Sequence, residues 1–137
     1  MRVRTTLGVC AAIALTLGVT PSAYAADHSM HTEGDVFFPG QDYGGNMWFN
    51  EYGDVVTVCD GDADGKAAEL RVYNGKVGGG TRYLVYARGD GNCTTRKVSM
   101  GGSYNLPEDS YVGFQLCLHT EGYGSGYCNN ANWYNDH

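Results

Sequence analysis

The chain is poor in basic residues and in proline. Its 137 residues include nine Lys and Arg against fifteen Asp and Glu, and only three Pro. Loss of Arg2 and Arg4 with an amino-terminal leader leaves seven basic residues, so the net charge becomes 7 − 15 = −8. Binding to nucleic acid backbones and to anionic membranes depends on clustered Lys and Arg. The composition therefore argues against nucleic acid and membranes as partners, and it favours solubility.

Motifs of catalysis and of zinc binding are also lacking. Four histidines are spread along the chain: His28, His31, His119 and His137. The sequence has no C-x-x-C or H-x-x-x-H spacing, so it does not predict a zinc site. Ser125 lies in Gly-Ser-Gly rather than in a G-x-S-x-G elbow, and Glu108 and Asp109 are adjacent, so their side chains point apart. We therefore expect a protein that is not an enzyme and needs no cofactor.

Residues 1–25 have the features of a secretory signal peptide. Two arginines precede the apolar run from Leu7 to Val19, Pro21 interrupts it, and Ala23-Tyr24-Ala25 forms an A-x-A cleavage site. The run is shorter than the roughly 18 apolar residues that a membrane anchor requires. We predict cleavage after Ala25 and a secreted, extracellular mature protein.

Cysteine usage fits export. Four cysteines follow the leader: Cys59, Cys93, Cys117 and Cys128. An even number in an exported chain predicts two disulfides, for which three pairings are open. We favour Cys59–Cys93 with Cys117–Cys128, because the second pair brackets a glycine-rich turn that can bring its flanks together.

Long helices are not expected, because no stretch of the mature chain keeps a 3.6-residue apolar period. Several stretches instead alternate with period two; residues 112, 114, 116 and 118, all apolar, share one face of a strand. We expect about seven strands: 46–52, 54–60, 66–74, 81–88, 93–100, 110–119 and 126–134. Short strands at this spacing predict an all-β fold, either a small barrel or a sandwich. Our first choice is an antiparallel β-sandwich of the immunoglobulin-like arrangement, without the Cys…Trp…Cys pattern of true immunoglobulin domains.

Residues 26–45 differ from the domain expected over residues 46–137. They are polar and glycine-rich apart from Val36, Phe37 and Phe38, and Pro39 stops any strand there. One interpretation is that the phenylalanines fold back as an edge strand or a plug for the core. The other is a flexible arm whose apolar tip inserts into a partner.

Aromatic residues are plentiful among Gly and Asn. Tyrosine and tryptophan offer large, rigid contact area and are enriched at recognition surfaces. At predicted turns or strand ends we expect exposed binding residues: Tyr43, Tyr52, Tyr123 and Tyr127. For the core we expect Trp48, Phe49, Phe114 and Trp133.

Two segments suggest metal binding. Asp60, Asp62 and Asp64 with Gly65 match the first half of an EF-hand loop, but Arg71 stands where the bidentate Glu belongs. We interpret this loop as a turn between strands, and a calcium site completed by backbone carbonyls or by Asp90 is the alternative. The mature amino terminus, Ala26-Asp27-His28, offers nitrogen ligands that suit Cu(II) or Ni(II), and Met30 and His31 could add ligands for reduced copper.

Several segments together resemble small exported proteins of Streptomyces and related actinobacteria: "DVVTVCDGDADGKAAELRV", "GDGNC", "LPEDSYVGFQLCL" and the closing "YC…W". The resemblance covers roughly residues 54–133. It rests on matches at Cys59, Asp60, Ala63, Asp64, Gly65 and Cys117. It implies a β-sandwich with paired cysteines, no catalysis and no particular ligand.

Some small exported β proteins of those bacteria are adaptor subunits of secreted toxin particles, in which an N-terminal extension docks into a lectin subunit. Others inhibit hydrolases, although this chain lacks the Trp-Arg-Tyr loop of the small amylase inhibitors. We therefore expect a secreted module that binds another protein through its arm, as an adaptor or accessory subunit of an extracellular assembly. The alternatives are an extracellular polysaccharide-binding module and an inhibitor of a secreted hydrolase.

Overall fold

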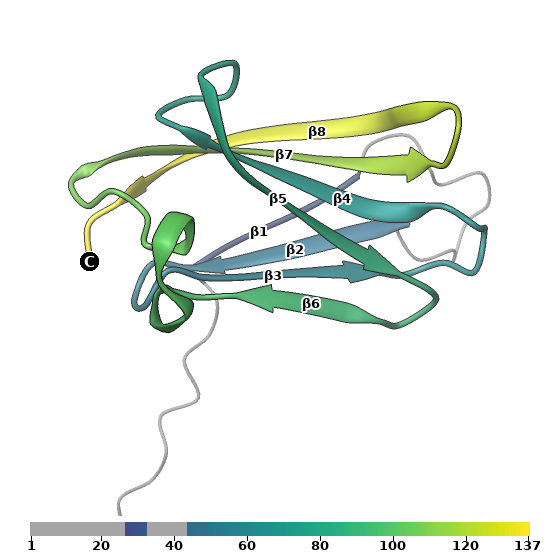
Figure 1. The fold of residues 1–137 in the computed structure, drawn as a ribbon, viewed down its shortest axis with the longest axis horizontal. Coiled ribbons are helices and arrows are strands. Elements are labelled where there is room, and N and C mark those ends of the chain that lie inside the picture. Colours follow the sequence, from purple (N-terminus) through teal and green to yellow (C-terminus); the bar gives the residue numbers. More distant parts are fainter. Residues whose placement is uncertain (1–26, 33–43) are drawn as a thin grey trace, which may run out of the picture.

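The computed structural model describes residues 27–32 and 44–137, which fold into two stacked antiparallel sheets of four strands each (Figure 1). The first sheet consists of β1 (His28–His31), β2 (Gly45–Asn50), β3 (Val55–Asp60) and β6 (Cys93–Arg96), in that order. The second sheet consists of β5 (Gly80–Arg88), β4 (Ala67–Asn74), β7 (Ser110–Thr120) and β8 (Gly124–Asn135), in that order. No helix in these residues is long and apolar enough to cross a membrane.

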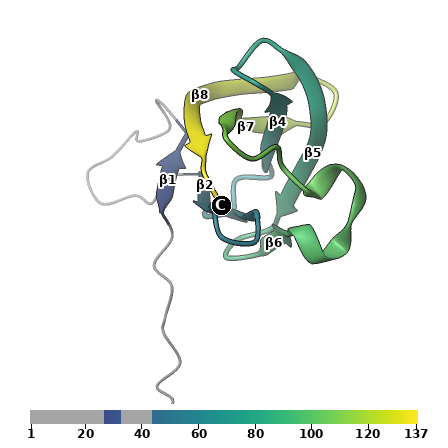
Figure 2. The same ribbon diagram turned by 90° about the vertical axis from the view of Figure 1, so that its left-hand side faces the viewer.

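The connectivity is that of an immunoglobulin-like sandwich. Strands β2, β3 and β6 in one sheet and β5, β4, β7 and β8 in the other match the strand sets A-B-E and C′-C-F-G. Figure 2 shows the chain passing from one sheet to the other between β3 and β4, between β5 and β6, and between β6 and β7. The predicted fold class is therefore confirmed, with one additional strand, β1, beside β2.

Strand β1 lies within residues 26–45, the segment that the sequence led us to place outside the domain. It pairs antiparallel with β2 from His28 opposite Phe49 to His31 opposite Asn46, and Met30 is buried between the sheets. Residues 28–31 therefore belong to the domain rather than to a free arm. The apolar tip, residues 36–38, lies outside the described residues.

Alternation along the strands builds the core as predicted. Val112, Phe114 and Leu116 are fully buried on β7, and Phe114 packs against Phe49 of β2 across the sandwich. Trp133 is partly buried and packs against Phe114, with ring centroids 5.1 Å apart. The expectation of a buried Trp48 is wrong: this side chain is 40% exposed, because its neighbours on β2, Met47 and Phe49, point inward.

The expected strand 93–100 is shorter in the structure. It ends at Arg96, and the chain continues as two 3₁₀ helices, η1 (Val98–Met100) and η2 (Gly102–Tyr104). The N–H of Val98 donates to the carbonyl of Gly53 instead of to a neighbouring strand. Gly101 and Gly102 have positive φ angles, which turn the chain away from the sheet.

The two disulfides pair as favoured from the sequence, Cys59 with Cys93 and Cys117 with Cys128. The first joins β3 to β6 and the second joins β7 to β8. Each bridge lies within one sheet, because Cys59 alternates with the buried Val58 and Asp60, and Cys117 alternates with Leu116 and Leu118. The sandwich is thus held between its sheets by apolar packing rather than by an intersheet disulfide.

Candidate functional site

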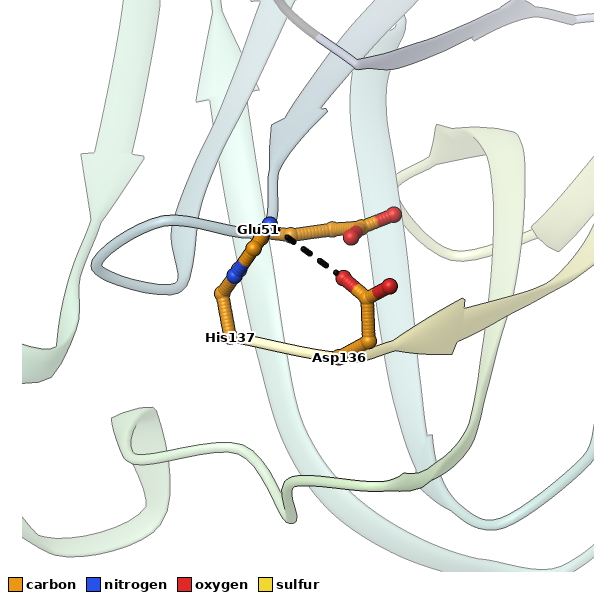
Figure 3. Close-up of side chains that lie close together, drawn as sticks. All are labelled: Glu51, Asp136 and His137. Carbon is orange, nitrogen blue, oxygen red and sulfur yellow. Dashed lines mark ion pairs between the residues drawn. The ribbon is translucent and has the colours of Figure 1, made fainter.

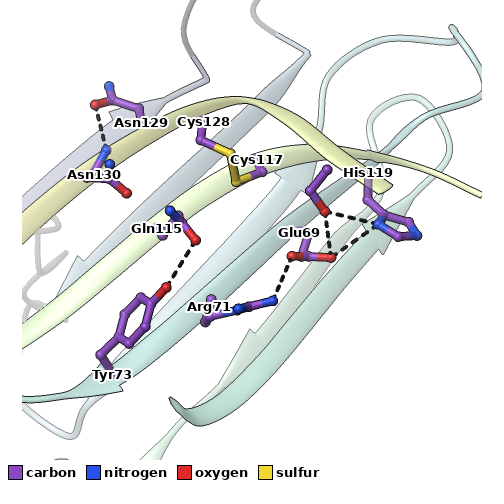
Figure 4. The surroundings of a disulfide bond; sticks show 10 residues. Glu69, Arg71, Tyr73, Gln115, Cys117, His119, Cys128, Asn129 and Asn130 are labelled. Atoms are coloured by element: carbon purple, nitrogen blue, oxygen red, sulfur yellow. Dashed lines mark hydrogen bonds and ion pairs between the residues drawn. A yellow bond between two sulfur atoms is a disulfide. The ribbon is translucent and has the colours of Figure 1, made fainter. Parts of the chain in front are cut away.

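The outer face of the second sheet is the main surface on which polar and aromatic side chains gather. Ala68, Leu70 and Val72 of β4 point into the core, so Glu69, Arg71 and Tyr73 point outward. Their neighbours on β7 by strand register are Cys117, Gln115 and Gly113. Figure 4 shows these outward side chains around the Cys117–Cys128 bridge. The β4–β5 turn folds over one end of this face, where the backbone of Lys76 and Val77 lies against Gly113 and the Val77 N–H donates to Asn132 Oδ1 at 2.7 Å.

Glu69 forms the centre of a polar cluster on this face. It is only 5% exposed, although it lies on the outer side of the sheet. The Ser125 hydroxyl donates to Glu69 Oε2 at 3.1 Å, and His119 Nδ1 lies 3.3 Å from the same oxygen. Arg71 Nη2 lies 3.7 Å from Glu69 Oε1. A buried carboxylate is tolerated here because side chains from three strands surround it.

Tyr86 of β5 completes the cluster. Its ring packs edge-on against His119, with centroids 5.7 Å apart. Burial raises the pKa of the Tyr86 phenol, and its hydrogen bond to the Glu69 carboxylate and the negative charge of that group raise it further. The phenol therefore stays neutral and serves as a hydrogen-bond donor.

Ser125, His119 and Glu69 differ from a catalytic triad in one decisive respect. The same histidine nitrogen, Nδ1, lies 3.1 Å from the Ser125 hydroxyl and 3.3 Å from the Glu69 carboxylate. A triad needs the imidazole to bridge the two groups through its two different nitrogens. The cluster is thus arranged to hold charges and hydrogen bonds in place rather than to activate Ser125.

Aromatic and apolar side chains extend the face on both sides of the cluster. Leu84 and Tyr86 alternate with the buried Tyr83 and Val85 on β5, so both point outward and are partly exposed. Tyr111 and Tyr134 are cross-strand neighbours with ring centroids 5.4 Å apart, and each is about half exposed. The face combines a fixed polar centre with exposed rings.

Next to the cluster the described residues form one further side-chain hydrogen bond and leave one polar atom without a partner. The Tyr73 hydroxyl donates to Gln115 Oε1 at 3.0 Å. The Nε of Arg71 is buried and finds no hydrogen-bond partner among the described residues. A buried polar atom without a partner is uncommon in proteins and marks a place where a ligand or water can add a bond.

The predicted binding tyrosines are exposed but are not brought together. Tyr52 is 69% exposed in the turn between β2 and β3, whereas Tyr123 is 92% exposed in the turn between β7 and β8. These turns lie at opposite ends of the sandwich, because β8 runs from the second turn toward the first (Figure 1). The other predicted binding residues, Val36, Phe37, Phe38 and Tyr43, lie outside the described residues.

Tyr127 occupies a β-bulge. The register between β7 and β8 shifts between Leu116 and Leu118, and Tyr127 has a φ of 54°, which is rare for an aromatic residue. The bulge lets the neighbouring Cys128 meet Cys117 on the outer face. The exposed Tyr127 ring lies 5.4 Å from Lys66 Nζ, so it contacts the loop before β4 rather than the cluster.

The loop that resembles a calcium site, residues 60–65, connects neighbouring parts of the fold through hydrogen bonds. Asp60 is 1% exposed; its Oδ2 accepts the Gly89 N–H at 2.7 Å, and its Oδ1 accepts the Asp62 N–H at 3.4 Å. Burial raises the pKa of Asp60, although these two N–H groups act against the shift. The carboxyl connects the end of β3 to the turn between β5 and β6.

Asp64 has a different set of partners. Its Oδ1 accepts the Lys66 backbone N–H at 2.8 Å, and its Oδ2 pairs with Lys66 Nζ. Burial alone would raise the pKa of Asp64, but the hydrogen bonds and charge of Lys66 outweigh it and lower the pKa. Among the described residues, the ligand atoms that gather within 4.8 Å belong to Glu51, Asp136 and His137 rather than to the three aspartates of this loop. The calcium alternative stays a prediction.

The copper prediction also stays open, because Ala26 lies outside the described residues. The His28 ring stacks on Trp133 with centroids 4.8 Å apart, and its Nε2 lies 2.6 Å from Glu51 Oε1. The imidazole is thus already held against the domain.

The Glu69 cluster was missed from the sequence. His119 and Ser125 lie 50 and 56 positions after Glu69 along the chain, and only the register of β4, β7 and β8 brings them together. The available signal was that Glu69 alternates with the apolar residues Ala68 and Leu70, which placed it on the outer face of its strand. Comparison of the chain with protein-family models, with curated proteins and with solved structures finds no match.

Proposed function

We propose that this chain is a secreted, non-enzymatic binding module that recognises another protein through the outer face of its second sheet. The observation that supports this most directly is the buried Glu69 cluster on the outer face, flanked by the partly exposed side chains of Leu84, Tyr86, Tyr111 and Tyr134. Protein interfaces are enriched in tyrosine and arginine and are centred on groups whose positions are fixed before binding. The proposal moves the recognition surface from the arm to the sheet.

The arrangement of the rings on this face favours a protein over a sugar chain. A sugar stacks on an open aromatic face, whereas Tyr86 packs edge-on against His119, and Tyr111 packs edge-on against Tyr134. Paired rings of this kind contribute contact area without conformational freedom to lose. The Arg71 side chain is 38% exposed, so its guanidinium can donate to a carbonyl of the partner.

Export is part of the proposal. The leader pattern of residues 1–25 predicts it, and the two disulfides are of the kind that persists in an oxidising compartment. Mass spectrometry of protein recovered from culture supernatant should give an amino terminus at Ala26. An intracellular protein that retains residues 1–25 would contradict this part.

The test of binding is recovery of partners from culture supernatant by the immobilised mature protein, with matched variants. Leu84→Ala with Tyr86→Ala truncates the second sheet's face, and Trp48→Ala removes an equally exposed ring from the first sheet. We expect the double variant to bind the partner at least about tenfold more weakly than the parent, as loss of a hot spot should cause. Trp48→Ala should bind with the affinity of the parent.

Three further experiments make the result decisive. Deletion of residues 33–43 tests the alternative in which the N-terminal segment binds the partner. Retention on chitin, cellulose or cell-wall polysaccharide that depends on Tyr86 would replace the protein partner with a glycan. Stoichiometric loss of a hydrolase activity would identify the partner as an enzyme. Equal recovery by the double variant and the parent would refute the proposed face.

A further inference from the structure

Three side chains that can bind a metal ion come together at the end of the sandwich opposite the β7–β8 turn. Glu51 belongs to the turn between β2 and β3, whereas Asp136 and His137 follow β8. One ligand atom from each lies within 4.8 Å of the other two. Figure 3 shows Asp136 and His137 beside Glu51, with His137 Nε2 3.4 Å from Asp136 Oδ1. This group could not be predicted from a local motif, because Glu51 lies 85 positions before Asp136.

Glu51 is held in position by neighbours that are not themselves in the group. His28 Nε2 lies 2.6 Å from Glu51 Oε1 and so fixes the orientation of this carboxylate. The backbone N–H of Glu51 donates to Asp27 Oδ2 at 2.9 Å. The His28 ring is itself fixed by stacking on Trp133, with an interplanar angle of 8°. Outer hydrogen bonds of this kind orient the ligands of metal sites in proteins.

The donor set defines the class of ion. One imidazole and two carboxylates are the ligands that zinc binds, typically with three protein ligands and a water. Calcium and magnesium prefer sites made of oxygen alone. A divalent ion also offsets the repulsion between two neighbouring carboxylates.

We propose that Glu51, Asp136 and His137 bind a first-row divalent transition-metal ion, with zinc as the best match, and that His28 positions Glu51. The ion joins three separate parts of the chain: the β2–β3 turn, the segment after β8 and, through His28, strand β1. Strand β1 is an edge strand with a single neighbour, β2, so it gains most from this additional connection.

The experiment is calorimetric titration of the untagged mature protein with zinc chloride, together with thermal unfolding with and without the ion. We expect one zinc ion per chain and a higher melting temperature. Zinc is the appropriate probe because the amino-terminal nitrogens of Ala26-Asp27-His28 would select Cu(II) or Ni(II) instead.

Four variants separate this site from other histidines and carboxylates. His137→Ala and Asp136→Asn each remove an exposed ligand, so the fold should survive and zinc affinity should fall at least tenfold. His28→Ala should weaken binding by about 10- to 100-fold through Glu51, as loss of an orienting neighbour does. His119→Ala, at the opposite end of the sandwich, is the matched control and should bind as the parent does.

Two results would overturn the proposal. The first is the absence of both binding heat and thermal stabilisation in the parent protein. The second is zinc binding that is unchanged by His137→Ala and Asp136→Asn, which would place the ion elsewhere. Neither result bears on the protein-binding face, because that face lies on the outer side of the second sheet.

Discussion

Asp60 and Glu69 are buried carboxylates that lie in different sheets of the sandwich, and their hydrogen-bond partners differ in kind. Asp60 ends β3 of the first sheet and accepts backbone N–H groups, from Gly89 and Asp62. Glu69 lies on β4 of the second sheet and is surrounded by side chains, those of Ser125, His119 and Arg71. Backbone donors are fixed by the fold, whereas side chains can exchange partners when a ligand arrives.

The difference agrees with the proposal that the second sheet, and not the first, is the recognition surface. The outer side of the first sheet has small polar contacts such as the hydrogen bond between Thr57 and Thr95 hydroxyls, 2.9 Å long, beside the partly exposed ring of Trp48. The second sheet presents charged groups and several rings. The two disulfides do not distinguish the sheets, because each sheet has one within its outer face.

Loss of the disulfides should have the largest effect, and it should be unequal. Cys59 and Cys93 are 34 positions apart, whereas Cys117 and Cys128 are 11 apart. By the loop-entropy relation, replacing the first pair with serine should lower the free energy of unfolding by about 4 kcal/mol and the second by about 3 kcal/mol. Urea unfolding of both double variants measures this. A larger decrease in the free energy of unfolding for the second pair would show that chain entropy is not the main source of the stabilisation.

Removal of the carboxylates of Asp60 and Glu69 should have the next largest effect. Asp60→Ala leaves the Gly89 N–H without its acceptor inside a rigid turn, so we expect a loss of about 2 kcal/mol in the free energy of unfolding. Glu69→Ala should cost about 1 kcal/mol, because Arg71 and His119 can turn toward water. Asp60→Asn and Glu69→Gln are the matched controls. Equal losses for the two alanine variants would remove the distinction between the sheets.

The carboxyl of Asp60 should make the stability of the parent depend on pH in a way that Asp60→Asn does not share. Burial raises its pKa in the folded protein above the ordinary value of 3.8. The folded protein therefore takes up a proton at Asp60 before the unfolded chain does, and this group's contribution to stability rises as pH falls through the folded pKa toward 3.8. The stability of the parent relative to Asp60→Asn should accordingly increase from pH 7 to pH 4. A difference that stays constant or shrinks would be incompatible with a raised pKa.

Calcium should have the smallest effect. Asp60 is engaged by backbone N–H groups and Asp64 by Lys66, so an ion would have to displace both sets of contacts. We expect millimolar calcium chloride to leave the melting temperature of the parent unchanged. A rise that Asp62→Asn with Asp64→Asn abolishes would instead establish the loop as a calcium site.

The sequence predicted those parts of the fold that depend on local pattern. Alternation in residues 110–119 placed Val112, Phe114 and Leu116 inward, and the glycine-rich turn correctly favoured Cys117 with Cys128. Strand β1 was missed because four residues, His-Ser-Met-His, show too little alternation to mark an edge strand. Trp48 was assigned to the core on residue type, although its position between Met47 and Phe49 already pointed it outward.

The candidate sites depend on pairing between distant strands, which no local pattern encodes. Glu69 meets Ser125 only through the register of β4 with β7 and of β7 with β8. The bulge at Tyr127 shifts that register by one residue, so even correct strand boundaries would have paired the wrong side chains.

Hydrogen–deuterium exchange of the protein, alone and with the partner recovered from supernatant, tests the central claim most directly. The account predicts slower exchange on binding in β4, β5 and β7, centred on residues 69–73, 84–86 and 115–119. Exchange in the strands of the first sheet should stay unchanged. Protection confined to the first sheet or to residues 33–43 would contradict recognition by the second sheet.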